Sequence, residues 1–562
     1  MSKLTCLAEN QIKQTVINAL KKAMEKGELV TAEIPDFKVE IPADTSHGDY
    51  SANAAMVGAR AFRTAPVKIA QIIVENADLS GTYFEKLETA GPGFLNFFLS
   101  PLFNSETVLD VLNQKENYGK SDYGQGKRVL VEFVSANPTG PMHIGNARGG
   151  ALGDCLASVM NAAGFKADRE FYINDSGNQI EKFSMSLDIR YRQACGEDVE
   201  MPEDSYHGQD IIDHVNAYKE QFGDSLMNED ETERKKKLCA FALPKNIEGL
   251  ERDLKKYKIV YDKWFKESTL HNDGSVKWVV EELKKRGYTY EQEGAVWFKA
   301  TEFGADKDFV LVRANGFATY VVPDIAYHYN KLTTRGYDMA IDILGADHHG
   351  YVPRLKAALT ALGVDADRLT VVLMQMVRLV RNGEIIKASK RSGKAITLVT
   401  LLEEVPVDAA RFYFNLREAN SPFDFDLDLA VENTSQNPVY YVQYAHARIC
   451  SIFKNLAAEG ITPRTVTAKE LCCLTADEEK ELIRHIAAFS EEISECARLL
   501  DPTGLTKYAV TLATLFHKFY NACRVKCDDE VLMQSRLALC EAVRQTVKNT
   551  LDILKIDAPE IM

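Results

Sequence analysis

The sequence lacks the features that mark several classes of protein. Its 562 residues contain no run of about 18 apolar residues, so a membrane-spanning helix is not expected. The N-terminal stretch MSKLTCLAENQIKQ lacks the apolar core of a secretory signal. No low-complexity segment and no repeat of solenoid period is evident. We therefore expect a cytoplasmic globular protein with no membrane partner, and its 46% hydrophobic and 26% charged residues are typical of that class.

The 11 cysteines include no C-x-x-C pair, so a structural zinc site is not expected. Their odd number, in a cytosolic setting, favours free and mostly buried thiols over disulfides. The 67 basic and 81 acidic residues give a net charge of −14, which argues against a general nucleic-acid coat and against DNA as a partner. A local basic groove on an acidic body is still compatible with this balance.

Three parts of the chain differ in pattern. Residues 1–106 combine helical spacing, the alternating stretch EIPDFKVEIP and a Gly-Pro turn leading into FLNFF, which predicts an α+β domain. Residues 107–425 predict an α/β domain with a charged helical insertion at about 185–275. Residues 426–562 repeat apolar side chains at spacings of three and four, which predicts an all-α helical bundle.

The α/β part begins with a strand, a turn, a helix and a second strand. RVLVEFVSA (128–136) meets the turn NPTGP, a helix follows from about Met142 to Ala163, and DREFYIND is the next strand. This order is a βαβ unit and implies a parallel sheet. Further strands are expected at AVWFKA, FVLVRA, ATYVV, DMAIDILGA and TVVLMQMV.

The segment VEFVSANPTGPMHIGNARGG carries the first chemical pattern, because His143, Gly145 and Asn146 open the helix that follows a strand. Ligands of doubly wound sheets bind beyond the carboxyl ends of strands, where free amides at a helix N-terminus attract phosphate. Gly145 would allow close approach of a flat base or ribose, and His143 could donate to phosphate oxygens as charge develops in a transition state. Taken alone, the tripeptide also fits a plain strand–turn–helix joint with a surface histidine.

A second pattern is the cationic segment IIKASKRSGK at residues 385–394. Lysines such as Lys387 and Lys390 act as compact charges on a polyphosphate, and a flexible loop can close on it when the nucleotide is bound. Considered alone, the segment is more often a basic surface hairpin. Its position after the last β strand, well beyond the His-Ile-Gly helix, favours the functional interpretation.

A candidate cation pocket lies in ATYVVPDIAYHYN, where Tyr320 and Asp324 are four residues apart at the start of a helix. A carboxylate can accept two parallel N–H donors from a guanidinium, and a phenol can stack on it or bond to it. Glu132 could supply a second acidic contact. A helix-start Asp is more often an N-cap or a first-turn acid, so the residues alone leave this choice open.

Together these segments resemble the arginyl-tRNA synthetase family of class I aminoacyl-tRNA synthetases, over nearly the whole chain. The first resembles the HIGH motif in the context A-N-P-T-G-P-L-H-I-G-H-A-R-G, with Met142 for Leu and Asn146 for the second His. The second resembles the KMSKS loop, with Ala388 for Met. The resemblance implies a Rossmann-like class I catalytic domain between an added N-terminal domain, which contacts the tRNA elbow, and a helical anticodon-binding domain.

The resemblance also implies roles for single residues. The catalytic group would be His143, Asn146, Lys387 and Lys390, and ATP would be bound by these four with Asn137 and Gly145. The arginine pocket would comprise Glu132, Ser135, Asn137, Tyr320, Asp324 and His348. His348 stands where relatives often carry Gln. Adjacent side chains such as Asp347, His348 and His349 rarely converge on one ion, so we expect no protein-bound metal.

The segment SQNPVYYVQYAHARICSI (435–452) resembles the start of the family's anticodon-binding domain. Aromatic rings stack on splayed bases and Arg contacts base edges or phosphates, so the candidate RNA-facing residues are Tyr441, Gln443, Tyr444 and Arg448. Each is at least as easily interpreted as core or as helix surface.

By this resemblance the enzyme would activate L-arginine with ATP to arginyl-adenylate and pyrophosphate, then transfer arginine to the 3′-terminal ribose of tRNA(Arg). Mg²⁺ would accompany the phosphates, tRNA would be needed for activation, and a monomer is expected. One rival is a cysteinyl- or glutamyl-type synthetase. The missing Cys–His zinc set opposes the first, and the acidic pocket opposes the second. Another rival is a non-catalytic paralogue, suggested by Asn146 and Ala388 but opposed by the retained lysines.

Overall fold

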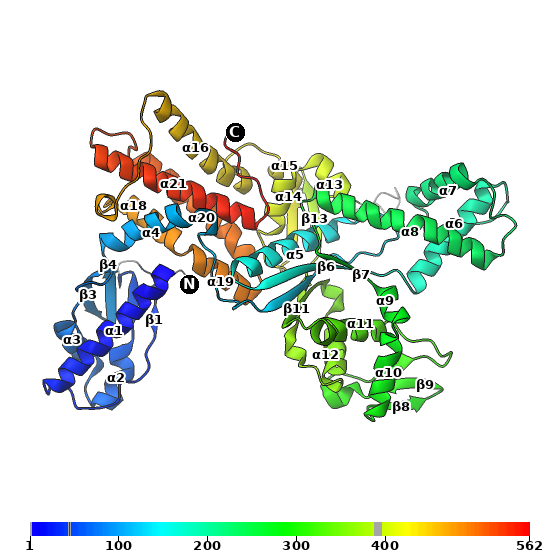
Figure 1. Ribbon diagram of the computed structural model, residues 1–562, viewed down its shortest axis with the longest axis horizontal. Helices are drawn as coiled ribbons and strands as arrows, with labels where there is room; N and C mark the ends of the chain where they lie inside the picture. Colours follow the sequence, from blue (N-terminus) through cyan, green and yellow to red (C-terminus); the bar gives the residue numbers. More distant parts are fainter. Residues whose placement is uncertain (1–2, 43, 45–46, 387–395) are drawn as a thin grey trace.

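The computed structural model describes residues 3–42, 44, 47–386 and 396–562. Figure 1 shows an elongated molecule with the parallel sheet near its middle. The N-terminal domain and the helical bundle lie toward one end, and an arm of helices projects at the other. Among the described residues, no helix combines the length and apolarity needed to cross a membrane. All eleven cysteines are free thiols, but only four are fully buried, fewer than the sequence predicts.

The N-terminal domain is an antiparallel sheet covered by helices. The sheet has the order β1-β2-β4-β3, with bounds Val39–Glu40, Tyr50–Ala52, Phe94–Leu99 and Phe84–Ala90. The helices are α1 (Lys3–Glu25), α2 (Ala54–Phe62) and α3 (Pro66–Asn76). The apolar face of α1 is buried in this domain's core, which explains the 3.6-residue spacing of its sequence. The stretch EIPDFKVEIP pairs only at β1, so it forms a much shorter strand than its alternation suggests.

The central sheet is parallel, as predicted. It has the order β12-β11-β5-β6-β7, with bounds Leu369–Met374, Met339–Gly345, Arg128–Glu132, Lys166–Ile173 and Lys263–Lys266. Helix α5 (Ile144–Ala162) connects β5 to β6. Strand order reverses between β5 and β11, and in open sheets of this kind the ligand crevice lies at that point, beyond the carboxyl ends of the strands.

Two predictions for this part are wrong in detail. The strand expected over ATYVV is absent, because α11 (Val321–Tyr329) begins there with Tyr320 as its N-cap. The helical arm comprises α6 (Asn178–Ala194), α7 (Gln209–Phe222) and α8 (Glu231–Lys256). The sheet resumes at β7 and is followed by α9 (Glu267–Asn272), so the helical insertion does not extend to residue 275. The aromatic side chains of β7 pack in the sheet, although charged residues surround them in the sequence.

Smaller sheets and helices surround the central sheet. One antiparallel sheet has strands β8 (Thr289–Gln292), β9 (Ala295–Phe298) and β10 (Phe309–Val312). The other is formed by β13 (Val377–Arg381), β14 (Glu384–Ile385) and β15 (Phe423–Asp426). The remaining helices of this part are α10 (Ser275–Lys285), α12 (Val352–Ala361), α13 (Leu398–Glu404), α14 (Val407–Phe414) and α15 (Leu427–Ala430).

The C-terminal part is a helical bundle, as predicted. Its helices are α16 (Pro438–Ala458), α17 (Ala468–Leu471), α18 (Asp477–Ala487), α19 (Phe489–Leu499), α20 (Thr503–Ala522) and α21 (Glu530–Ile553). Helix α4 (Pro101–Gln114) packs against α17, α18 and α21, so the boundary expected after residue 106 falls within a helix of this assembly. The bundle shares one continuous apolar core with α5 and the central sheet.

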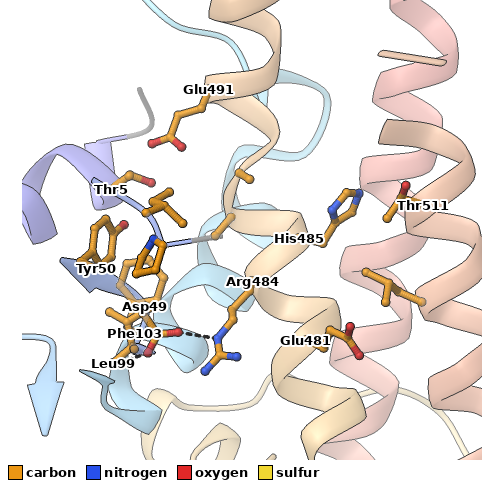
Figure 2. Close-up of a pocket in the computed structure, with 16 residues that line it drawn as sticks. Thr5, Asp49, Tyr50, Leu99, Phe103, Glu481, Arg484, His485, Glu491 and Thr511 are labelled. Carbon is orange, nitrogen blue, oxygen red and sulfur yellow. Dashed lines mark hydrogen bonds and ion pairs between the residues drawn. The ribbon is translucent and has the colours of Figure 1, made fainter. Parts of the chain in front are cut away.

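A cavity of about 390 Å³ separates the N-terminal sheet from α18, α19 and α20 (Figure 2). Arg484 bridges the two sides, because its Nε lies 2.6 Å from Oδ1 of Asp49. Glu491 also lines this cavity, and burial, together with the charge of Glu9, raises the pKa of its carboxyl to about 7. The interface between the N-terminal domain and the helical bundle therefore contains an ion pair as well as apolar contacts.

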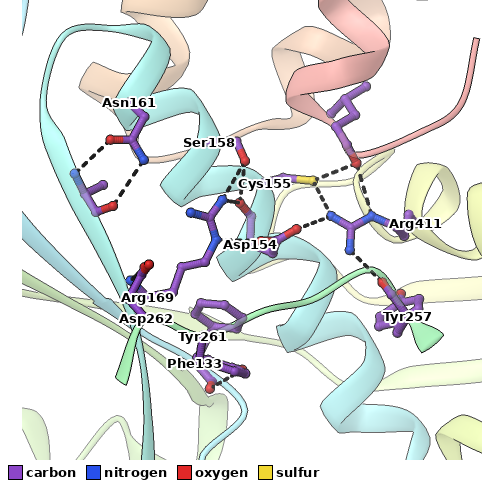
Figure 3. A network of polar contacts seen from close by, with 12 residues as sticks. Phe133, Asp154, Cys155, Ser158, Asn161, Arg169, Tyr257, Tyr261, Asp262 and Arg411 are labelled. Carbon is purple, nitrogen blue, oxygen red and sulfur yellow. Dashed lines mark hydrogen bonds and ion pairs between the residues drawn. The ribbon is translucent and has the colours of Figure 1, made fainter. Parts of the chain in front are cut away.

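A buried polar network joins α5 to the C-terminal part (Figure 3). Asp154 of α5 accepts hydrogen bonds from Arg411 of α14 and, at 2.6 Å, from Nε of Arg169. Arg411 is fully buried and also donates to the backbone carbonyls of Tyr257 at 2.9 Å and Leu554 at 3.1 Å. This single guanidinium thus links the helix that starts at His143 to the chain just beyond α21.

Candidate active site

The candidate site lies at the carboxyl edge of the central sheet, where strand order reverses. Glu132 ends β5 and stands in register with Asp342 of β11. Both carboxylates are buried, with exposures of 7% and 2%. Unpaired buried charges are very costly, so partners for these two acids are required by the fold itself.

The loop after β5 is held in an unusual backbone conformation. Val134 and Ser135 have φ values of 68° and 41°, a region that L-residues other than Gly rarely adopt. Strained backbone of this kind is typical of functional sites. The strand therefore ends at Glu132, earlier than predicted, and the turn directs the Ser135 hydroxyl back to Oε1 of Glu132 at 2.8 Å. Oγ of Ser135 also accepts a hydrogen bond from the amide of Tyr172 at 3.1 Å. Asn137, farther along the loop, is exposed.

The N-terminus of α5 is open to a ligand. His143 is the exposed N-cap, and Oδ1 of Asn146 accepts a hydrogen bond from its backbone amide at 3.1 Å. Apart from its chain neighbours and the backbone of its own helix, no atom of the described residues lies within 4 Å of the position that a Cβ on Gly145 would occupy. The partial positive charge of a helix start favours a phosphate here, and the bare glycine leaves space for a flat group.

Lys387 and Lys390 lie outside the described residues, but both flanks of their segment are described. The amide of Ile386 bonds to the carbonyl of Leu379 at 2.8 Å. On the other side, the amide of Ile144 bonds to the carbonyl of Ile396 at 3.2 Å, and His143 forms an isolated β-bridge with Thr397. The described chain after the cationic segment therefore lies directly beside the start of α5.

Asp324 and Tyr320 flank a candidate cation pocket at the start of α11. Oδ2 of Asp324 accepts a hydrogen bond from the hydroxyl of Tyr351 at 2.5 Å. Burial raises the pKa of Asp324 to about 6, and the charges of Glu132 and Glu267 act in the same direction, whereas the positive charge of His328 opposes them. Tyr320 is 71% exposed and its ring centroid lies 6.0 Å from that of Tyr351. Two phenol rings therefore stand beside a half-buried carboxylate with access to solvent on the Tyr320 side.

A buried ammonium joins this pocket to the sheet. Nζ of Lys331 contacts Oε2 of Glu132 at 2.5 Å and Oδ1 of Asp342 at 2.8 Å. The ligand atoms of Glu132, His328 and Asp342 lie close enough together to suggest a metal site. Lys331 already supplies the cation for both carboxylates of that group, so the donor set does not fit an additional ion.

The sequence analysis missed Tyr351, His328 and Lys331. A signal for two of them was present, because Asp324, His328 and Lys331 are spaced at i, i+4 and i+7 and share one helix face. Lys331 lies in a π-helical turn, Asn330–Thr334, and such turns occur frequently at functional sites. Tyr351 is brought in from a separate segment, and no local pattern marks it.

His348 lies in the short helical turn that follows β11, at the same edge of the sheet. Its ring is half-exposed and its Nδ1 lies 3.3 Å from both the carbonyl of Gly345 and Oδ1 of Asp347. Within the described part of the chain, His348 makes its polar contacts only with residues of its own turn. The same edge thus carries His143, Asp324 and His348, of which Asp324 is connected to Glu132 through buried groups.

The candidate RNA-facing residues of α16 separate into two sets. Tyr441, Tyr444 and Arg448 line a cavity of about 340 Å³ with Tyr440 and His517. Arg448 donates to the Tyr444 hydroxyl at 3.0 Å, and its guanidinium lies 4.8 Å from the centre of that ring. Gln443 is not in this cavity: its Nε2 donates to Oδ2 of Asp408 at 3.1 Å and to the carbonyl of Asp557 at 2.9 Å.

Comparisons with known proteins agree with this architecture. Residues 107–450 match the family model "tRNA synthetases class I (R), catalytic domain". Residues 10–99 match "Arginyl tRNA synthetase N terminal domain", and residues 442–562 match "DALR anticodon binding domain". The fold and these matches define the chain as a class I aminoacyl-tRNA synthetase, a ligase that uses ATP.

Curated relatives narrow the class to one family. Arginine–tRNA ligase of Acetivibrio thermocellus is 52% identical over 556 residues, 99% of each chain. That of Caldanaerobacter subterraneus is 52% identical over 562 residues, the whole of both chains. A putative arginyl-tRNA synthetase structure from Campylobacter jejuni has a TM-score of 0.74 and 32% identity, covering 83% of this chain and 100% of the other. The chain therefore belongs to the arginyl-tRNA synthetase family and is an arginine–tRNA ligase.

Proposed function

We propose that arginine is selected at Asp324 and Tyr320 and is activated beside the N-terminus of α5. The observation that supports this most strongly is the half-buried carboxylate of Asp324, which lies at the start of α11 with the exposed Tyr320 and has only a phenol as its side-chain partner among the described residues. A guanidinium presents parallel N–H donors that match a carboxylate, and Tyr320 is exposed beside it as a surface for stacking. Glu132, which is paired with Lys331, and Ser135, Asn137 and His348 complete the wall around the amino acid.

The reaction has two steps. A carboxylate oxygen of arginine attacks the α-phosphorus of ATP, the P–O bond to the β-phosphate breaks, and pyrophosphate leaves. A ribose hydroxyl at the 3′ end of tRNA(Arg) then attacks the carbonyl carbon of the adenylate and AMP leaves. His143, Gly145 and Asn146 hold the nucleotide on the helix start, so catalysis consists mainly of positioning and of stabilising charge on the phosphates.

Lys387 and Lys390 stabilise the leaving pyrophosphate; the described residue Thr397, which follows them in the chain, lies beside His143 and supports this role. Mg²⁺ would accompany the phosphates and offset the charge that develops on them, and it would need no dedicated cage of protein side chains. We expect no structural zinc, because apolar cores stabilise the three domains among their described residues.

The other domains bind tRNA. The N-terminal domain, which precedes α4, contacts the elbow, and residues 426–562 bind the anticodon at the cavity lined by Tyr441, Tyr444 and Arg448. Aromatic rings beside an Arg suit unstacked bases. Gln443 contributes to tRNA binding only by stabilising the fold, because its amide donates to Asp408 and Asp557. The whole protein works as a monomer in the cytoplasm, with no DNA or membrane partner.

The test is aminoacylation by purified protein with ATP, Mg²⁺, tRNA and each amino acid in turn. We expect charging with arginine and discrimination against lysine and citrulline of about 10⁴ or more, because either would leave polar groups of the pocket unpaired. Equal or better charging with another amino acid would overturn the proposal. Pyrophosphate exchange with and without tRNA distinguishes the non-catalytic alternative, which predicts none in either case.

A further inference from the structure

The ring of His328 lies between two oxygen acceptors beneath the pocket. Its Nδ1 is 2.7 Å from the backbone carbonyl of Asp324, and its Nε2 is 2.6 Å from Oδ2 of Asp342. A carbonyl and an ionised carboxylate can only accept, so both ring nitrogens must donate. A histidine that donates from both nitrogens is an imidazolium, and this one is 5% exposed.

Lys331 is the second cation in this buried group, beside His328. It is fully buried and contacts the carboxylates of Glu132 and Asp342, and its Nζ lies 3.4 Å from Nε2 of His328. Two cations and two carboxylates balance each other, so this buried group carries no net charge. Such a group is tolerated in the interior only when all of its members are present and hydrogen-bonded.

Asp324 stands outside this balance. Among the described residues its side chain accepts one hydrogen bond, from the neutral hydroxyl of Tyr351. Its backbone carbonyl, by contrast, is held by the His328 ring one turn later. The pocket therefore presents one negative charge, that of Asp324, which no cation compensates. The nearest cation on the same helix is His328, which lies one turn below Asp324 and holds the backbone carbonyl of its turn.

We propose that His328, held by Asp342, is a positioning residue for arginine: its imidazolium keeps the Asp324 carboxylate ionised and its turn of α11 in place. This inference rests on the proposed function of Asp324 as the guanidinium contact. His328 does not touch the substrate and acts through Asp324 alone. Nothing in the established activity requires a charged histidine at this position.

The charges around Asp324 determine the sign of the effect. Glu132 of β5 and Glu267 of α9 face it and disfavour its ionised form, as does burial. The hydroxyls of Tyr351 and Tyr172 also approach it, the latter from β6. His328 opposes these effects with its positive charge. When that charge is removed, the pKa of Asp324 rises further above its ordinary value, and the carboxylate is ionised only at higher pH.

The kinetic test compares His328→Gln with wild type between pH 6 and pH 9. Gln can donate to one acceptor but carries no charge. We expect the KM for arginine of the variant to rise at neutral pH and to recover in alkali. The pH at which KM(arginine) increases should move upward by about one unit, the shift that a tenfold change in proton affinity produces. The KM for ATP should stay unchanged. His446→Gln, which replaces another buried histidine in α16, is the matched control and should leave every profile unchanged.

A loss of arginine affinity that is equal at every pH, or that is shared with ATP, would overturn the proposal in favour of a purely structural role. A direct measurement covers the case in which the variant does not fold. In wild-type protein labelled with ¹⁵N-histidine, NMR should show one histidine ring that carries protons on both nitrogens, and its absence would equally overturn the proposal. Wild-type charging is measured in parallel: failure to use arginine would count against the proposed function, whereas the histidine signal would still report on His328.

Discussion

The hydroxyl of Tyr351 donates a hydrogen bond to Oδ2 of Asp324 at 2.5 Å, and this contact joins the segment before α12 to the first turn of α11. The bond fixes the orientation of the carboxylate before any substrate arrives. A pre-oriented acceptor loses less conformational freedom on binding, so the guanidinium gains affinity from a group that it does not itself touch.

Replacing Tyr351 with Phe removes that hydroxyl and keeps the ring. We expect the KM for arginine to rise by roughly 10- to 100-fold, about the value of one hydrogen bond to a charged group. The KM for ATP should stay within a factor of about two, because the change lies on the amino-acid side. Steady-state aminoacylation measures both, and an unchanged KM for arginine would show that the carboxylate is oriented by other groups.

Gly145→Ala tests the space at the start of α5. The position of the added methyl is free of described atoms within 4 Å, so the fold should tolerate it and the melting temperature should not fall. If the nucleotide approaches the bare backbone there, the KM for ATP should rise by about tenfold or more, a loss of about 1.4 kcal/mol. Gly249→Ala in α8, away from the site, is the control. Normal ATP use by Gly145→Ala would place the nucleotide elsewhere.

Asp154→Asn should destabilise the protein strongly. The change leaves the buried guanidinium of Arg411 and that of Arg169 without their shared carboxylate, and such a loss typically costs about 3–5 kcal/mol. Glu495→Gln removes an exposed ion pair with Arg498 and should change little. Urea unfolding followed by circular dichroism measures both. A similar small effect for the two variants would mean that the network in Figure 3 contributes no stability.

Glu491 should make the protein less stable as pH rises. Its pKa in the folded protein is raised to about 7 from an ordinary value of 4.5, so its stabilising contribution is complete below about pH 4.5 and is lost as pH rises through about 7. Glu491→Gln cannot ionise and should melt at a higher temperature than wild type at pH 8, but not at pH 5. Glu495→Gln on the same helix is the control. Equal melting temperatures of Glu491→Gln and wild type at pH 8 would refute the shift.

Local patterns predicted the elements on which the site is built. The βαβ unit was predictable because apolar strands, the NPTGP turn and the helix opened by His143 are contiguous in the sequence. The end of β5 at Glu132 was not predictable, because positive φ values at Val134 and Ser135 depend on the surrounding fold. ATYVV has strand-forming residues, yet it leads into α11, since packing of that helix overrides local preference.

Only some residues of the pocket could be predicted from the sequence. Tyr320 and Asp324 are neighbours on one helix start, so their spacing could be interpreted directly. The role of Lys331 could not be predicted, because it depends on the fold, in which β5 and β11 place Glu132 and Asp342 beside its ammonium group. Likewise Gln443 adjoins Tyr444 in the sequence, but successive helix residues point in different directions, and the structure directs Gln443 to Asp408 instead.

The measurement that tests the account most directly is the kinetics of Asp324→Asn with arginine and with ATP. Asn keeps the size of the side chain but cannot supply the negative charge that pairs with a guanidinium. We predict that kcat/KM for arginine falls by about 100-fold or more, the cost of removing one partner of a buried charged pair, while the KM for ATP changes by less than about twofold. A variant that uses arginine as well as wild type does, or that loses arginine and ATP equally, would contradict the assignment of Asp324.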